Sequence, residues 1–134
     1  MKTELFWLAL TTIMTGLMWV PYVLDRIAVR GLKATLANPS PRDKPHTGWA
    51  SRLLFAHDNT VENLVVFGIL VLILDALVIS TPYTVMACMV YFWARLAYAV
   101  IYAMGIPVLR TLAFTVGFLA QVVLALSIFR LIGT

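Results

Sequence analysis

The residues of this chain with the most chemical potential lie in a stretch that is otherwise nonpolar. Asn59, Glu62 and Asn63 recur at helical spacing, so they share one face of a helix. The same helix continues from Leu64 to Leu74 through apolar residues, apart from Gly68. Because an unpartnered polar group in hydrocarbon costs several kcal/mol, we expect each of these side chains to have a partner.

A second group of polar side chains enters an apolar segment later in the chain. Arg95, Tyr98 and Tyr102 form one stripe at i, i+3 and i+7, although Tyr102 could equally be an interfacial aromatic residue. Arg95 and Glu62 reach similar depths, roughly 15 Å from one membrane face at about 1.5 Å per residue. The sequence therefore predicts a Glu62–Arg95 pair, within or between subunits. Such a pair could simply hold helices together or belong to a binding site.

Arg110 and Thr111 stand in the first turn of an expected helix, where the helix dipole disfavours a cation. One explanation is the excess of basic residues at the cytoplasmic face of membrane proteins. The other is an anion site made by Arg110, the Thr111 hydroxyl and the free backbone N–H groups. Together with the arginine and tyrosine stripe, this predicts a basic cleft for a small anionic or zwitterionic ligand. His57, Asp58 and Glu62 lack a metal-ligand spacing, so no metal site is predicted.

The composition places these residues in a membrane. The 134 residues are 62% hydrophobic and 12% charged, whereas a soluble domain is about half apolar and about a quarter charged. The length suits four spans of roughly 20 residues. We therefore expect an all-α integral membrane protein built as a four-transmembrane-helix bundle. The net charge of +4 gathers in one loop, which indicates membrane lipids as partners and no nucleic acid.

The chain is expected to form one domain over residues 1–134. Its four expected spans cover residues 4–28, 50–80, 82–104 and 107–132. The first should kink near Pro21, which lacks a backbone donor, while Gly105 should end the third and Pro107 should open the fourth. Most basic residues lie in or beside the loop at 31–45, so we expect this helix 1–2 loop in the cytoplasm and both termini on the far side.

Three segments resemble the MAPEG family, the membrane-associated proteins of eicosanoid and glutathione metabolism. Residues 56–63 (AHDNTVEN) are similar to its signature. Residues 91–98 (YFWARLAY) and 105–112 (GIPVLRTL) resemble its third and fourth helices, especially in bacterial members. The resemblance covers nearly the whole chain. It implies a homotrimer in a bacterial inner membrane, with glutathione bound between neighbouring subunits.

The resemblance also implies roles for individual residues. Glutathione would be held by Arg30, Asn59, Glu62, Arg95, Tyr98 and Tyr102. Arg110 would face the thiol of glutathione and lower its pKa, because a guanidinium stabilises the nucleophilic thiolate. Thr111 would be a supporting hydroxyl. The implied activity is that of a glutathione-dependent transferase or peroxidase acting on small lipophilic electrophiles.

Three positions depart from the family pattern. Phe55 stands where characterised members usually have arginine, Asp58 where the prostaglandin and leukotriene synthases have another, and Phe114 where some synthases have tyrosine. Arg52, one turn before Phe55, is a candidate substitute cation. The departures at Phe55 and Asp58 favour a second function, that of a non-catalytic membrane protein that binds a lipid or small ligand or scaffolds a complex. A third, a small multidrug transporter, would need a mid-span glutamate that the first span lacks.

Overall fold

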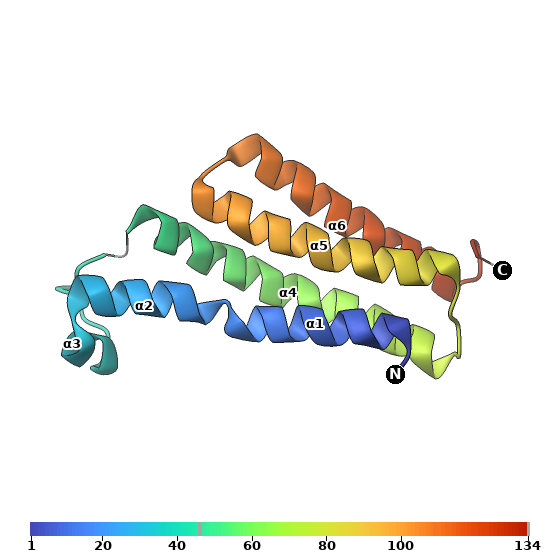
Figure 1. Ribbon diagram of the computed structural model, residues 1–134, viewed down its shortest axis with the longest axis horizontal. Coiled ribbons are helices and arrows are strands. Elements are labelled where there is room, and N and C mark those ends of the chain that lie inside the picture. The colour runs from blue at the N-terminus through green and yellow to red at the C-terminus, as the bar shows by residue number, and fades with distance from the viewer. Residues whose placement is uncertain (46, 134) are drawn as a thin grey trace.

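The computed structural model of the protein describes residues 1–45 and 47–133, which contain no strand. The helices are α1 (Thr3–Leu17), α2 (Trp19–Arg30), α3 (Leu32–Leu36), α4 (Gly48–Ala76), α5 (Pro82–Met104) and α6 (Pro107–Ile128). Within the described residues, four helical segments are long and apolar enough to cross a membrane: α1 with α2, α4, α5 and α6. The protein is therefore an all-α integral membrane protein with a four-helix bundle, as the sequence predicts (Figure 1).

The helices run up and down between two ends of the bundle (Figure 1). Both termini and the α4–α5 connection lie at one end, while α3 and the α5–α6 connection lie at the other. The core between the helices divides into two clusters along their length. One is centred on Phe67 and Tyr91, whose rings stack with centroids 3.9 Å apart. The other contains Ala50, Ala56 and Ala99, small residues that let membrane helices approach closely.

The helix boundaries follow from the local sequence. α1 and α2 are separated at Met18, because Pro21 has no N–H to donate to the Leu17 carbonyl, and this is the predicted kink. Gly105 ends α5 at a φ of +78°, a left-handed conformation that suits glycine. Pro107 then opens α6. The short turn makes α5 and α6 a hairpin.

A buried carboxylate ties α1 to the α4–α5 connection. Glu4 is only 4% exposed and accepts hydrogen bonds from Ser80 Oγ at 2.6 Å and Thr84 Oγ1 at 2.8 Å. Thr84 also forms a capping box with Thr81 at the start of α5. The same hydroxyl therefore fixes both the beginning of α5 and its attachment to α1.

We expect Glu4→Ala to lower the free energy of unfolding by about 1–3 kcal/mol, because both hydroxyls lose a charged acceptor. Unfolding in one detergent, followed by circular dichroism, measures this loss. Lys2→Ala is the matched control. Lys2 and Asp75 form an exposed ion pair at 3.1 Å, and such a pair contributes at most ~1 kcal/mol. Equal losses in the two variants would contradict the anchoring role of Glu4.

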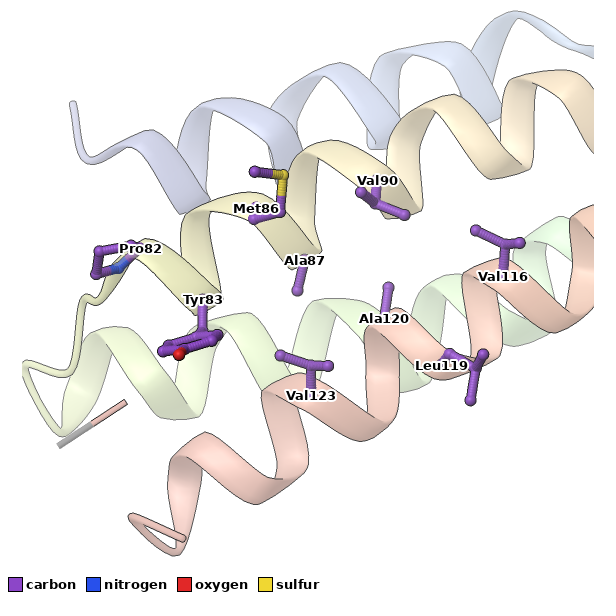
Figure 2. A pocket seen from close by; sticks show the side chains of 9 residues that line it. All are labelled: Pro82, Tyr83, Met86, Ala87, Val90, Val116, Leu119, Ala120 and Val123. Carbon is purple, nitrogen blue, oxygen red and sulfur yellow. The ribbon is translucent and has the colours of Figure 1, made fainter. Parts of the chain in front are cut away.

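An apolar groove of about 450 Å³ lies between α5 and α6, near the end of the bundle that carries the termini (Figure 2). Its walls carry no charged side chain. The groove lies far along both helices from Arg110 and shares no lining residue with the pocket beside that arginine.

Candidate functional site

Arg95 is the buried centre of the polar residues that the sequence analysis singles out. It is 1% exposed, and its Nη2 donates hydrogen bonds to Asn59 Oδ1 at 2.7 Å and Thr60 Oγ1 at 2.8 Å. These bonds join α5 to α4 inside the bundle. Charge-assisted hydrogen bonds of this kind offset part of the cost of burying a guanidinium.

The predicted Glu62–Arg95 pair is wrong for the single chain. Glu62 is exposed, whereas Arg95 is enclosed and bonds to Asn59 and Thr60. The reason is the rotation of α4 about its axis. Its buried face contains Ala56 and Thr60, and a residue two positions further on points roughly 200° away around the helix. The similar depths of Glu62 and Arg95 in the membrane were therefore not enough to identify the partner of Arg95.

Aromatic rings pack against the other side of the Arg95 guanidinium. Its guanidinium carbon lies 4.2 Å from the ring centroid of Tyr98 and 5.8 Å from that of Phe114. Tyr98 in turn meets Tyr102 edge to face, with centroids 5.5 Å apart. The predicted stripe on α5 is thus a continuous row of contacts, and cation–π attraction to Tyr98 holds the guanidinium at one end of it.

Arg110 lies at the other end of this row. Its guanidinium carbon is 4.5 Å from the Tyr102 centroid. A pocket of about 170 Å³ is lined by Tyr98, Arg110, Thr111 and Phe114. No acidic side chain of the described residues forms an ion pair with Arg110. The pocket therefore combines an uncompensated cation with aromatic walls, which is an environment for a small anionic group.

Thr111 lines the pocket, but its hydroxyl proton already takes part in a hydrogen bond within α6. Its Oγ1 donates to the Pro107 carbonyl at 3.2 Å, within the first turn of α6. In this rotamer the hydroxyl oxygen can only accept a further hydrogen bond. Thr111 would have to release Pro107 before it could donate to a ligand.

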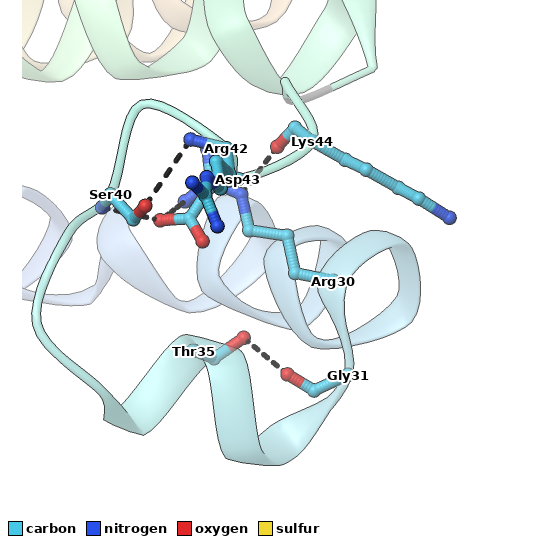
Figure 3. Close-up of polar contacts among 7 residues, drawn as sticks. All are labelled: Arg30, Gly31, Thr35, Ser40, Arg42, Asp43 and Lys44. Carbon is cyan, nitrogen blue, oxygen red and sulfur yellow. Dashed lines mark hydrogen bonds and ion pairs between the residues drawn. The ribbon is translucent and has the colours of Figure 1, made fainter.

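Arg30 has its contacts in the connection between α2 and α4. Its Nε donates to the Lys44 carbonyl, and its Nη1 lies 3.9 Å from the Asp43 carboxylate (Figure 3). Asp43 also accepts from the Ser40 backbone N–H at 3.0 Å. In the single chain, Arg30 organises this loop and does not line the Arg110 pocket.

Arg52 does not supply a substitute cation to the pocket. Its Nε donates to the Ala103 carbonyl at 3.0 Å, in the last turn of α5. A Cβ added to Gly105 would lie 3.2 Å from the Arg52 guanidinium carbon, so the arginine packs directly over the turn. A cation at the negative end of a helix dipole is favourable, and Arg52 has this capping role.

Two polar contacts near the site are not among the predicted ones. Thr60 accepts a hydrogen bond from Arg95. Its position one turn after Ala56, on the small-residue face of α4, is the sequence signal that could have revealed this contact. Tyr22 on α2 meets His57 on α4, with the hydroxyl oxygen 2.8 Å from Nδ1. No sequence pattern links residues from two helices in this way, so the Tyr22–His57 contact had no local signal.

The sequence profile of the MAPEG family matches residues 5–130. The chain belongs to the MAPEG family. No curated protein and no solved structure matches it. The matched region includes every candidate site residue from Arg30 to Thr111. The protein is therefore an integral, multi-pass membrane protein of a family of eicosanoid and glutathione metabolism, whose members generally use glutathione and are generally trimeric.

The positions at which the resemblance implies departures from the family pattern lie mostly outside the Arg110 pocket. Phe55, Asp58 and Glu62 are all exposed, Phe55 at 59%, and follow one another at i, i+3 and i+7 along one face of α4. Phe114 is the exception, because it lines the pocket. Phe55 and Asp58 therefore belong to an outer surface of α4 and do not line the Arg110 pocket.

Proposed function

We propose that this MAPEG protein is a membrane-embedded, glutathione-dependent transferase or peroxidase that acts on lipophilic electrophiles. The observation that carries the proposal is the position of Arg110, beside a small pocket and without an acidic partner among the described residues. Its guanidinium is held by the Tyr102 ring, a contact that leaves its N–H groups available to a ligand.

The chemistry of the transferase reaction follows from that position. The thiol of glutathione loses its proton to solvent, and Arg110 stabilises the thiolate that remains. The thiolate sulfur attacks the electrophilic carbon, so that an S–C bond forms and the leaving group departs with its electron pair. Tyr98 and Phe114 supply an apolar wall for the electrophile. Thr111 is proposed as the supporting hydroxyl once it releases Pro107.

The pocket of one chain is too small for the whole tripeptide. Its volume of about 170 Å³ lies below the roughly 300–1,000 Å³ of complete small-molecule sites. We propose that only the thiol end enters this pocket and that a homotrimer completes the site. Exposed Glu62 on α4 and Arg30 at the end of α2 would then be joined to the site across the interface. The remaining proposed glutathione ligands are Asn59, Arg95, Tyr98 and Tyr102.

The distribution of basic residues favours a membrane orientation in which a soluble thiol can reach the Arg110 pocket. The Arg110 pocket lies toward the same end of the bundle as α3 and the basic connection between α2 and α4. Positively charged loops are retained in the cytoplasm. We therefore propose that this end faces the cytoplasm across a bacterial inner membrane, where a soluble thiol can enter.

A second candidate function is a non-catalytic protein of the same fold that binds a lipid or small ligand. The observation in its favour is the enclosure of Arg95, whose Nη2 donates its hydrogen bonds to Asn59 and Thr60 of its own chain. In a non-catalytic protein, Arg95 would keep these contacts within the chain and would not bind a glutathione carboxylate. Exposed Phe55 and Asp58 likewise offer no cation.

A glutathione titration of the purified protein in detergent tests the proposal. We expect a thiolate absorbance that rises to saturation with wild-type protein and is absent with Arg110→Ala. Arg130→Ala is the matched control, because Arg130 lies beyond the far end of α6 and should leave the signal unchanged. Saturable binding without thiolate would favour the non-catalytic alternative, and a thiolate signal that survives in Arg110→Ala would contradict the proposed role of Arg110.

A further inference from the structure

The end of the bundle opposite to Arg110 carries a polar pocket that the proposed reaction does not use. It has a volume of about 270 Å³ and lies between the α4–α5 connection and the segment after α6. Its polar lining consists of Ser80, Thr81, Ser127 and Arg130. Pockets with one cation and several hydroxyls suit a phosphate or carboxylate group.

The apolar groove between α5 and α6 begins next to this polar pocket. Facing apolar side chains from both helices line the groove (Figure 2). They include Met86, Ala87, Val90, Val116, Leu119 and Val123. All of them lie within segments long and apolar enough to span a membrane. The groove therefore runs from the membrane face into the hydrocarbon region.

The two cavities are neighbours along both helices. Thr81 of the pocket is followed directly by Pro82 of the groove, and Ser127 lies one turn after Val123 and donates to its carbonyl at 2.9 Å. They also meet at Tyr83, since a Cβ on Gly133 would lie 3.2 Å from the tyrosine ring. One elongated molecule could occupy both, with its polar end in the pocket and its apolar end in the groove.

Among the described residues, Arg130 has no counter-ion at this end of the bundle. Lys2 is paired with Asp75 at 3.1 Å, and the carboxylate of Glu4 is occupied by Ser80 and Thr84. No ion pair joins Arg130 to an acid anywhere in 1–45 or 47–133. Arg130 is exposed and stands just after α6, at the end of a segment long and apolar enough to span a membrane. A basic residue at the end of a membrane span can reach the phosphate groups of lipids.

The Thr81 hydroxyl can donate a second hydrogen bond to a group bound by Arg130. Its Oγ1 accepts a hydrogen bond from the Thr84 N–H at 3.2 Å, so its own proton remains available for a ligand. Ser127, by contrast, already donates to Val123. The pocket thus provides one charged donor and one hydroxyl donor to the same bound group.

We propose that this composite site binds one anionic phospholipid of the surrounding bilayer. Its phosphate is bound by Arg130 and Thr81, and one acyl chain lies along the α5–α6 groove. The polarity of the two cavities matches the two ends of such a molecule. The charge of Arg130, which forms no ion pair within 1–45 and 47–133, selects an anionic headgroup. The site is separate from the Arg110 pocket and does not depend on glutathione chemistry.

Native mass spectrometry with two competing lipids tests this site. The purified protein, stripped of lipid in detergent, is offered equal amounts of phosphatidylglycerol and phosphatidylcholine with identical acyl chains. Wild-type protein should retain phosphatidylglycerol about fivefold better, which corresponds to ~1 kcal/mol for one basic residue near an anionic headgroup. Arg130→Gln should reduce this ratio to about one, whereas the paired cation in Lys2→Gln should leave it unchanged.

A bulky substitution tests the groove. Val123→Trp should lower the retention of both lipids, while Phe118→Trp, on an exposed part of α6 outside the groove, should not. Circular dichroism confirms that both variants remain helical. Equal retention of the two lipids by wild-type protein, or a preference that survives in Arg130→Gln, overturns the proposal. If Val123→Trp instead changes the number of chains in the assembly, a second copy covers the groove and the lipid proposal fails.

Discussion

Replacing Arg110 by alanine should slow conjugation of a chlorodinitrobenzene-type electrophile by about 10²–10³-fold, the loss typical of removing one charge-stabilising donor. Arg110 stands beside the pocket without an acidic partner in the described chain, so its loss removes the cation closest to the proposed thiolate. The effect should fall mainly on kcat, because the remaining glutathione ligands are unchanged. Steady-state kinetics in detergent measures it.

The pH dependence of the rate separates this role from a structural one. A guanidinium lowers the pKa of the bound thiol, so the wild-type rate should reach its plateau at a lower pH than that of Arg110→Ala. The variant should therefore recover activity relative to wild type as the pH rises toward the pKa of a free thiol, about 8.5. Arg110→Lys keeps the charge and should restore part of the activity. Parallel pH profiles for Arg110→Ala and wild type would refute a role in thiol ionisation.

Replacing Arg95 by alanine should lower the free energy of unfolding by about 2–5 kcal/mol, the range for emptying the site of a large buried side chain. Arg95 is 1% exposed, and its removal also leaves Asn59 and Thr60 without their donor. Unfolding in detergent, monitored by circular dichroism, measures the loss. Arg110→Ala is the control and should cost less than about 1 kcal/mol, since Arg110 is partly exposed.

Arg95→Met distinguishes packing from charge. Methionine fills most of the volume beside Tyr98 and Phe114 and removes the cost of burying a cation. We expect it to recover at least half of the stability lost in Arg95→Ala. If Arg95→Met is as unstable as Arg95→Ala, the hydrogen bonds to Asn59 and Thr60 hold α4 and α5 together more strongly than packing does.

The two arginines of the site have different surroundings, and this bears on both candidate functions. Arg95 is enclosed between α4 and the aromatic residues, which is the arrangement of a structural cation. Arg110 borders a pocket and lacks a counter-ion in the described residues. We therefore expect a glutathione-dependent activity to depend on Arg110 and the stability of the fold to depend on Arg95. Arg110→Ala should therefore lose activity, whereas Arg95→Ala should lose stability.

The fold class could be predicted from the sequence because its causes are local and additive. A bilayer requires long apolar helices, and the composition of this chain supports four of them. Pro21, Gly105 and Pro107 mark the kink and the α5–α6 turn through their own backbone limits. The row from Arg95 through Tyr98 to Tyr102 likewise follows from helical spacing on one element.

Only the tertiary structure decided which side chains meet between helices. Helical spacing gives the depth of Glu62 and Arg95 but not the rotation of α4, so Thr60 rather than Glu62 joins Asn59 as a partner of Arg95. The capping role of Arg52 on Ala103 and the anchoring of Glu4 by Ser80 and Thr84 also arise between distant segments. The sequence by itself therefore determined a MAPEG-like bundle of four membrane helices. The packing angles between those helices determined its polar contacts, because each angle depends on all the facing side chains at once.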